Sequence, residues 1–494
     1  MIIKTRLAPS PTGFVHIGSL RLALYDYLFA KKNNGIYALR VEDTDQTRSV
    51  EGTYENMVKV FEEVGIIPNE GPSPYKDLGN GPYIQSERLP LYRPFIDKMI
   101  EEGNAYYCFC TSERLTELRA EQESLKLPTK YDGLCRDLPL EDAKKRIEDG
   151  EKYVVRLKVP KGEKISFNDL VRGRVEFSSS EVDDQVLLKS DGFPTYHGAV
   201  VIDDYLMKVT HAFRGVEWLS SMPKQILVAK FLKIELPEYA HLPLIVDINR
   251  KKLSKRSGDV AVEEYLKKGY LKEALLNFIL FLGWNPKTTE EIFSLEEMVE
   301  RFDIKDVHKS DAVFDIEKLN WMNGQYIIKT PIDELFAKLE KYLSTYEVDF
   351  YNNVFIKHND EYNKRILTEL KTRMKKFDEY IELTTFIYND SKINTSLLLN
   401  EKMGITTLEL AKTTLIIALD IINSQEEYNA ENIKNMFIEK IKEAGLKNGQ
   451  VLWPVRVALS GELFSPGAFE LIGILGPEKS SERIQKIIDE IEKI

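Results

Sequence analysis

The feature that most constrains this sequence is the junction of three segments between Met1 and Leu28. Residues 1–7 are mostly apolar and prolines end the run, which is typical of a buried strand leading into a loop. Apolar residues then recur at helical spacing from Leu20 to Leu28. A helix that starts at such a loop offers free N–H groups and the positive end of its dipole, which together bind anions. Gly18 would let a polyphosphate approach and His16 could donate to it, although an ordinary turn has the same pattern.

A short basic segment, from Lys251 to Gly258, is the second candidate. It contains Lys251, Lys252, Lys255 and Arg256. Taken alone, such a run is also compatible with a solvated loop. Beside an anion-binding loop it strengthens the prediction of a phosphate site, because several cations can meet one polyphosphate.

Both segments resemble motifs of the class I aminoacyl-tRNA synthetases. The first is similar to their HIGH motif, and Lys252 to Arg256 is similar to their KMSKS loop. Three further segments resemble the bacterial glutamyl-tRNA synthetase family: Ala-Pro-Ser-Pro-Thr-Gly at 8–13, Arg-Val-Glu-Asp-Thr-Asp at 40–45, and Pro-Thr-Tyr-His at 194–197. The likeness runs in the family's order from Arg6 to the C-terminus.

The resemblance implies ATP-dependent ligation of L-glutamate to tRNA through glutamyl-adenylate, with release of AMP and diphosphate. Mg²⁺ would accompany ATP. The tRNA could be tRNA(Glu), tRNA(Gln) or both. A glutaminyl-tRNA synthetase is an alternative, but those relatives carry β-barrels where this chain has a helical pattern. A catalytically inactive tRNA-binding paralogue is another, which the presence of His16, Lys252, Lys255, Arg6 and Glu42 disfavours.

The resemblance also implies roles for residues around ATP. His16, Lys252 and Lys255 would be catalytic, because phosphoryl chemistry depends on positioning and on stabilising charge at the phosphate oxygens. ATP would contact Ser10, Thr12, His16, Gly18, Glu217, Leu244, Ile245 and Lys255. Within this set, Glu217 is expected at the ribose and the Leu244–Ile245 main chain at the adenine.

Glutamate has two carboxylates and one ammonium group, so its pocket needs cations and acceptors. The resemblance assigns glutamate binding to Arg6, Ala8, Ser10, Glu42, Tyr196 and Arg214. Arg6 would meet the side-chain carboxylate and Arg214 would lie in the same pocket. Glu42 and Ser10 would hold the ammonium group, and Tyr196 would close the pocket.

Two positions depart from the family's usual pattern. Val200 stands where asparagine is usual, and Val216 stands where glutamate is usual. Val200 removes a polar contact to substrate, whereas Glu217 keeps the position expected at the ribose. Because Arg6 would still require an anion, glutamate remains the expected amino acid.

The chain has only three cysteines, Cys108, Cys110 and Cys135. An odd number argues against a disulfide framework. Their spacing resembles the family's zinc element, in which three thiolates reach one structural ion. Tyr131 or Asp137 would be the fourth ligand, and a lost metal site with free thiols is the alternative.

Composition bounds the class of protein and its partners. The 494 residues are 43% apolar and 30% charged, as in globular proteins of several domains. No stretch approaches the roughly 20 apolar residues of a membrane helix. We therefore expect a cytoplasmic monomer without a membrane partner. With a net charge of −11, any tRNA surface must be a local basic stripe.

Alternating strand and helix patterns predict an α/β fold with a Rossmann-type, doubly wound parallel sheet. The resemblance adds an inserted α+β connective domain and an all-α C-terminal anticodon-binding region. The predicted segments are 1–105 (catalytic domain, first half), 106–190 (connective insertion for the tRNA acceptor end), 191–250 (catalytic domain, second half), 251–324 (lysine loop and stem-contact helices) and 325–494 (helical region). In detail, residues 197–204 are predicted as sheet, and 363–386 as one helix that carries a basic cluster at 371–376.

Overall fold

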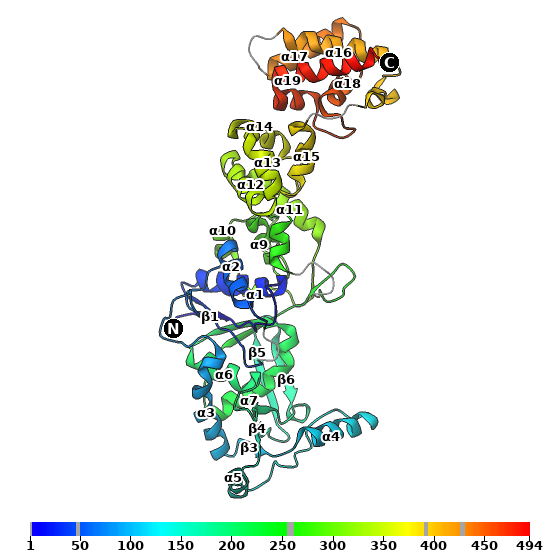
Figure 1. Cartoon of the computed structure of the whole chain (residues 1–494). Coiled ribbons are helices and arrows are strands. Elements are labelled where there is room, and N and C mark those ends of the chain that lie inside the picture. The colour runs from blue at the N-terminus through cyan, green and yellow to red at the C-terminus, as the bar shows by residue number, and fades with distance from the viewer. Residues whose placement is uncertain (1, 46–49, 254–260, 390–393, 425–429) are drawn as a thin grey trace. The chain divides into compact units, whose positions relative to one another are not determined.

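The computed structural model describes residues 2–45, 50–253, 261–389, 394–424 and 430–494 (Figure 1). The chain forms two compact units. The first contains Met1–Tyr265 and Lys272–Leu319, and the second contains Leu266–Leu271 and Asn320–Ile494. The finer division into five functional segments stays a prediction.

The main sheet of the first unit has, among the described residues, the strand order β2-β1-β8-β9-β5-β6. Its strands are β1 Lys4–Leu7, β2 Ile36–Leu39, β5 Lys164–Asp169, β6 Gly173–Ser178, β8 His211–Gly215 and β9 Glu238–Leu242. Strands β2, β1, β8 and β9 are parallel, while β6 runs antiparallel to β5. The predicted α/β class is confirmed. Strands β5 and β6 come from the segment expected as an insertion, and Asp169 of β5 pairs with Tyr239 of β9.

Two smaller sheets complete the described strands of this unit: an antiparallel one of β3 Ala105–Cys108, β4 Val154–Leu157 and β7 Val186–Leu188, and a parallel pair of β10 Ile245–Val246 and β11 Ala312–Val313. The helices of the unit are α1 Ile17–Lys32, α2 Thr53–Val64, α3 Leu89–Glu101, α4 Ser112–Ser124, α5 Leu140–Glu148, α6 Tyr196–Leu206, α7 Met222–Leu232, α9 Lys272–Leu280 and α10 Leu295–Arg301. Helices α8 Val262–Lys267 and α11 Ile316–Lys329 contain the points where the chain passes between the units.

Side-chain alternation along β8 explains how helices cover both faces of the main sheet. Phe213 faces α1, where its ring lies 5.3 Å from that of Phe29. Arg214, the next residue, faces the opposite side and contacts Gln225 of α7. Helix α6 packs beside α7, and both lie across the sheet from α1 (Figure 1). The loop before α1 and the ends of the parallel strands therefore meet at one edge of the sheet, as the fold class requires.

One predicted strand is wrong. Residues 197–204 belong to α6, in which Ala199 and Val200 are fully buried in a core shared with α3 and α7. A segment that is apolar on all sides shows no periodicity, so a buried helix and a buried strand read alike in the sequence. The β-branched Val200, Val201 and Ile202 favoured the wrong choice.

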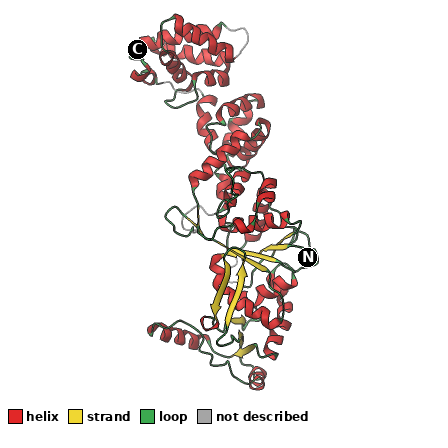
Figure 2. Cartoon of the chain, turned by 180° about the vertical axis from the view of Figure 1, so that it is seen from behind, coloured by secondary structure: helices red, strands yellow, loops and turns green. Residues whose placement is uncertain are grey.

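The second unit consists of helices joined by loops (Figure 2). Its helices are α12 Ile332–Tyr346, α13 Val348–Asn353, α14 Asp360–Leu370, α15 Glu379–Tyr388, α16 Leu408–Asn423, α17 Ala430–Glu443, α18 Asn448–Ser460 and α19 Ala468–Ile491. The predicted all-α C-terminal region is confirmed. None of the described helices is long and apolar enough to cross a membrane.

The single helix predicted over 363–386 is wrong, because a turn separates α14 from α15. The turn is held by hydrogen bonds to distant residues: Phe377 N–H donates to Gly269 (3.0 Å), and Asn323 Nδ2 donates to Lys375. These tertiary bonds override a helical apolar spacing. The basic cluster at 371–376 consequently follows a helix end instead of forming a helix face.

Candidate functional site

A cleft of about 110 Å³ in the first unit brings together the two motifs of the sequence. His16 and Gly18 line it from the start of α1, and Lys252 lines it from the basic segment. Glu217, Leu244 and Ile245 also lie in its wall. The cleft thus brings the start of α1 together with a lysine more than 200 residues further along the chain. Lys255 lies outside the described residues.

His16 caps the N-terminus of α1 with its own ring. Its Nδ1 accepts the main-chain N–H of Ser19 (3.1 Å), and its Nε2 lies 3.1 Å from Ser19 Oγ. Since Nδ1 is an acceptor, a neutral His16 carries its proton on Nε2. A Cβ at Gly18 would lie 3.0 Å from His16 Cε1, so glycine leaves the ring more room here than any other residue would.

The proline-rich loop lies beside this helix start. Ser10 and Thr12 line a second cleft of about 130 Å³ that also includes His16. Ala8 is half-buried at the end of β1. The main-chain N–H of Glu42 donates to the carbonyl of Pro9 (2.9 Å), which holds the loop against the residue expected to bind the ammonium group.

The described residues on either side of positions 254–260 are fixed by main-chain contacts. Lys252 bridges to Val246 at one end. At the other end, Val262 N–H donates to the carbonyl of Val15 (2.9 Å), next to a bridge between Ala261 and His16. Because His16 and Lys252 both line the cleft, these flanking residues lie close to it.

Arg6 and Glu42 belong to a buried ion network on the opposite face of the sheet from α1. Asp204 of α6 accepts hydrogen bonds from Arg6 Nε (3.1 Å) and Arg40 Nη1 (2.7 Å). Arg40 Nη2 donates in turn to Glu42 Oε1 (2.8 Å). The neighbouring Asp203 lies 3.8 Å from Arg40 Nε. It accepts hydrogen bonds from Arg88, Tyr92 and Gln85.

This network sets the protonation of its two central acids. Burial by itself raises the pKa of Asp204, but Arg6 and Arg40 outweigh burial and lower the pKa to about 2. Burial raises the pKa of Glu42 in spite of the same two arginines. Asp204 is thus an ionised carboxylate that orients Arg6 and Arg40.

Arg214 completes the predicted glutamate set and differs from Arg6 in its partners. Its Nη1 donates to Gln225 Oε1 (3.1 Å), and its guanidinium lies over the ring of Tyr239, 4.8 Å from the centroid. Its Nη2 is buried and has no hydrogen-bond partner among the described residues. Tyr196 is within electrostatic range of Arg214, Glu42 and Arg6, so these four of the predicted residues lie near one another.

Sequence reasoning missed Asp204, Arg40 and Gln225 as members of this site. Asp203 and Asp204 end a run of apolar residues, and acids in such a position are rarely buried unless they are paired. Two consecutive acids at the end of an apolar run therefore indicate that buried partners exist, but they do not identify those partners. Val200, the departure from the family pattern, is fully buried in the core between α6 and its neighbours.

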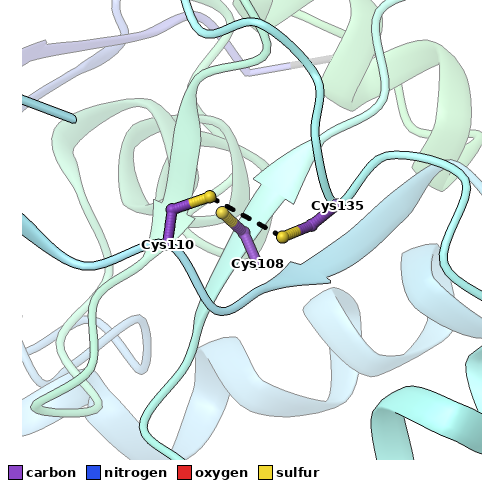
Figure 3. A group of neighbouring side chains, drawn as sticks. All are labelled: Cys108, Cys110 and Cys135. Atoms are coloured by element: carbon purple, nitrogen blue, oxygen red, sulfur yellow. Dashed lines mark hydrogen bonds between the residues drawn. The ribbon is translucent and has the colours of Figure 1, made fainter. Parts of the chain in front are cut away.

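The three cysteines form a compact cluster (Figure 3). Their sulfur atoms all lie within 4.8 Å of one another, and Cys110 Sγ is 3.7 Å from Cys135 Sγ. Cys108 ends β3, Cys110 precedes α4, and Cys135 comes from the loop after α4. Sulfurs that converge in this way from separate segments fit the donor set of a structural metal ion.

Tyr131 and Asp137, the two candidates for a fourth ligand, have different surroundings. The Tyr131 hydroxyl lies 3.4 Å from Cys108 Sγ and 3.5 Å from Cys110 Sγ, and it accepts the main-chain N–H of Cys135 (2.8 Å). The Asp137 side chain is 84% exposed and pairs with Lys158 (3.2 Å). Only the tyrosine oxygen adjoins the cluster.

Two family models match the chain: tRNA synthetases class I (E and Q), catalytic domain, over residues 2–321, and anticodon binding domain, over residues 334–488. The chain is 44% identical to a glutamate–tRNA ligase of Alkaliphilus metalliredigens over 98% of each chain. It is also 44% identical to one of Clostridium acetobutylicum over 99% of each.

Two solved structures are similar to this chain over 99% of its length. The crystal structure of a glutamate tRNA ligase from Elizabethkingia meningosepticum, in complex with its amino acid, has a TM-score of 0.88 and 34% identity over 99% of each chain. That of a glutamate–tRNA synthetase from Elizabethkingia anophelis has a TM-score of 0.87 and 35% identity. With both domain models and full-length relatives in agreement, the chain belongs to the glutamyl- and glutaminyl-tRNA synthetase family of class I aminoacyl-tRNA synthetases.

Proposed function

We propose that the chain attaches L-glutamate to the 3′ end of tRNA(Glu). In the first step the α-carboxylate of glutamate attacks the α-phosphorus of ATP, forming glutamyl-adenylate and releasing diphosphate. In the second, a ribose hydroxyl of the terminal tRNA nucleotide attacks the acyl carbon, and AMP leaves. The names of the full-length relatives support this reaction.

The buried guanidinium of Arg214 is the observation that best supports a substrate with a carboxylate group. Its Nη2 has no partner among the described residues, and leaving a buried charged donor unpaired costs roughly 1–3 kcal/mol or more. Arg6 donates hydrogen bonds from Nε and Nη2 to Asp204, so its Nη1 is the nitrogen available to a ligand. A carboxylate between these two nitrogens would accept hydrogen bonds from both arginines. The amide of glutamine would instead present an N–H donor to one of the two guanidinium groups, which would repel it.

The nucleotide cleft would hold ATP by its two ends. His16 Nε2 and the first N–H groups of α1 face the phosphates, and Lys252 and Lys255 would neutralise charge on the leaving diphosphate. Glu217 would contact the ribose, and the main chain at Leu244 and Ile245 would lie along the adenine. Ser10 and Thr12 would line the passage between ATP and glutamate. Mg²⁺ bound with ATP would neutralise phosphate charge.

We further propose that Cys108, Cys110, Cys135 and Tyr131 hold one zinc ion. The convergence of three sulfurs and a phenol oxygen supports this donor set, and the exposure of Asp137 counts against it as a ligand. The ion would be structural, fixing the loop after α4 to the end of β3. The helical second unit would bind the anticodon arm of the tRNA, in line with its domain model. The cytoplasmic location and the monomeric state stay predictions from the sequence.

Charging assays with two purified tRNAs test the proposal. Radiolabelled glutamate and glutamine are each offered with tRNA(Glu) and tRNA(Gln), in the presence of ATP and Mg²⁺. We expect glutamate on tRNA(Glu). Faster charging with glutamine would support the glutaminyl alternative, and binding of tRNA without charging of either amino acid would support an inactive paralogue.

A further inference from the structure

Arg21 is a buried cation beside the nucleotide cleft, and the reaction above gives it no role. It lies on α1 one turn after Gly18, is only 4% exposed, and lines the same cleft as His16 and Lys252. Its guanidinium donates to main-chain carbonyls: Nη1 to Leu282 (3.0 Å) and Nη2 to Pro243. A buried arginine that serves two carbonyls positions the main chain that carries them.

The two carbonyls belong to segments that meet at the cleft. Pro243 directly precedes Leu244 and Ile245 in the cleft wall. Leu282 follows the end of α9, and its N–H donates to the carbonyl of Ile279 in that helix (3.0 Å). The segments are in close contact, since a Cβ at Gly283 would lie 3.0 Å from Pro243 Cγ. Arg21 therefore joins α1, the cleft wall and the end of α9 at one point.

We propose that Arg21 is a positioning residue for ATP, which sets the distance between the wall facing the base and the helix start facing the phosphates. The inference rests on the proposed function, because it takes ATP as the ligand of the cleft. Helix α1 carries His16 and Gly18, so a wall tied to α1 through Arg21 cannot shift relative to the phosphate site. Displacing one end of a bound substrate by about 1 Å can cost up to roughly 10²-fold in rate.

Tyr25 offers a matched control, because it shares one of the two contacts of Arg21. One turn further along α1, its hydroxyl donates to the carbonyls of Leu280 (2.9 Å) and Leu282 (3.3 Å). No bond from Tyr25 to Pro243 is recorded among the described residues. Loss of the Tyr25 hydroxyl thus weakens the anchorage of α9 and leaves the tie to the cleft wall intact.

The test compares Arg21→Met, Arg21→Lys and Tyr25→Phe with the wild-type chain in glutamate charging of tRNA. KM is measured separately for ATP and for glutamate, and melting temperatures are recorded with and without ATP. For Arg21→Met we expect an ATP KM raised about tenfold with the glutamate KM within about twofold. For Arg21→Lys we expect an ATP KM between those of the wild type and Arg21→Met, because one ammonium group lacks the planar fork that reaches two carbonyls. Tyr25→Phe should lower the melting temperature without changing either KM.

The inference fails if Arg21→Met leaves the ATP KM unchanged, raises both KM values equally, or behaves like Tyr25→Phe. Should Arg21→Met not fold, Arg21→Lys decides by the same criterion. A wild-type chain that charges no tRNA with glutamate contradicts the proposed function instead. In that event the shift of the melting temperature by ATP, compared between wild type and Arg21→Lys, still decides the role of Arg21.

Discussion

The main-chain N–H of Val262 donates to the carbonyl of Val15 across 2.9 Å and so ties the residues after the basic segment to the loop before α1. Val15 directly precedes His16, and Val262 follows the lysine segment. With Lys252 bridged to Val246, the described residues on both sides of positions 254–260 are each held by a main-chain contact.

Val262→Pro tests this contact, because it removes the N–H donor at a position that accepts proline. Val262 is the first residue of α8, and Ala261 before it is in a bridge, so the local backbone suits proline. We expect kcat for tRNA charging to fall about tenfold, because the residues after the basic segment lose their hydrogen bond to the loop that carries His16. Val262→Ala is the control, since it trims the same buried side chain but keeps the N–H. Equal losses of kcat in the two variants would argue that packing matters and the hydrogen bond does not.

Arg214→Gln should weaken glutamate binding selectively. The substitution keeps a polar side chain near Gln225 but removes the charge and the unpartnered Nη2. Loss of one charge-assisted hydrogen bond of about 1.5–3 kcal/mol corresponds to a KM for glutamate raised roughly 10- to 100-fold. The KM for ATP, measured in the same charging assay, should stay within about twofold. A glutamate KM near that of the wild type would remove Arg214 from the carboxylate site.

Gly18→Ala should separate stability from activity. Alanine is favoured over glycine within a helix by about 1 kcal/mol, but its Cβ would press on the His16 ring at 3.0 Å. We expect the ring to shift by a few tenths of an ångström and to loosen its contact with Ser19, so kcat/KM for ATP should fall about tenfold or more. The melting temperature should stay close to that of the wild type. Unchanged kinetics would indicate that the orientation of His16 is not critical.

Much of the fold could be predicted because its elements carry their own signals. Helix α12 follows a regular apolar spacing from Ile332 to Tyr346, within the segment predicted as helical. The start of α1 was marked by prolines and a glycine, and the structure does bring His16 and Lys252 to one cleft. Local chemistry and family motifs were sufficient at these places.

What escaped prediction depends on contacts between distant segments. Asp204 pairs with Arg6 across 198 positions of sequence, and no local pattern announces that bond. The turn between α14 and α15 is fixed by Gly269 and Asn323, which again are far away. Arg21 lies buried at the cleft, and its residue type and position on a helix do not indicate that burial. Pairing partners, and hence the second layer of the site, require the folded chain.

Asp204→Asn should destabilise the first unit and change its response to acid. Removing one partner of a buried ion pair typically costs about 3–5 kcal/mol, here because Arg6 and Arg40 lose their shared counter-charge. Urea unfolding at neutral pH measures this loss. Asp204→Glu, which keeps the charge, is the comparison that separates the missing charge from altered packing.

The acid response of the same pair of proteins follows from the direction of the pKa shift. The pKa of Asp204 is lowered to about 2 in the folded chain, below its value of 3.8 when exposed. The carboxylate thus stabilises the fold above about pH 4, and this contribution of about 2 kcal/mol is lost as the pH falls from about 5 to about 2. The wild type should lose that much more unfolding free energy than Asp204→Asn over this interval. Parallel pH profiles would contradict a lowered pKa.

The proposed zinc site is tested by measuring the zinc content of variants at Cys135, Tyr131 and Asp137. Chain purified without chelator should contain about one zinc ion, which Cys135→Ser should lose because two thiolates and a phenol seldom hold a structural site. Tyr131→Phe should bind zinc more weakly, seen as faster transfer to a chromogenic chelator, since its oxygen lies 3.4 Å from Cys108 Sγ. Asp137→Asn is the matched control and should keep its zinc, because Asp137 pairs with Lys158 at the surface. Zinc lost from Asp137→Asn and retained by Tyr131→Phe would reverse the assignment of the fourth ligand, and a zinc-free wild type would leave the cluster as three thiols.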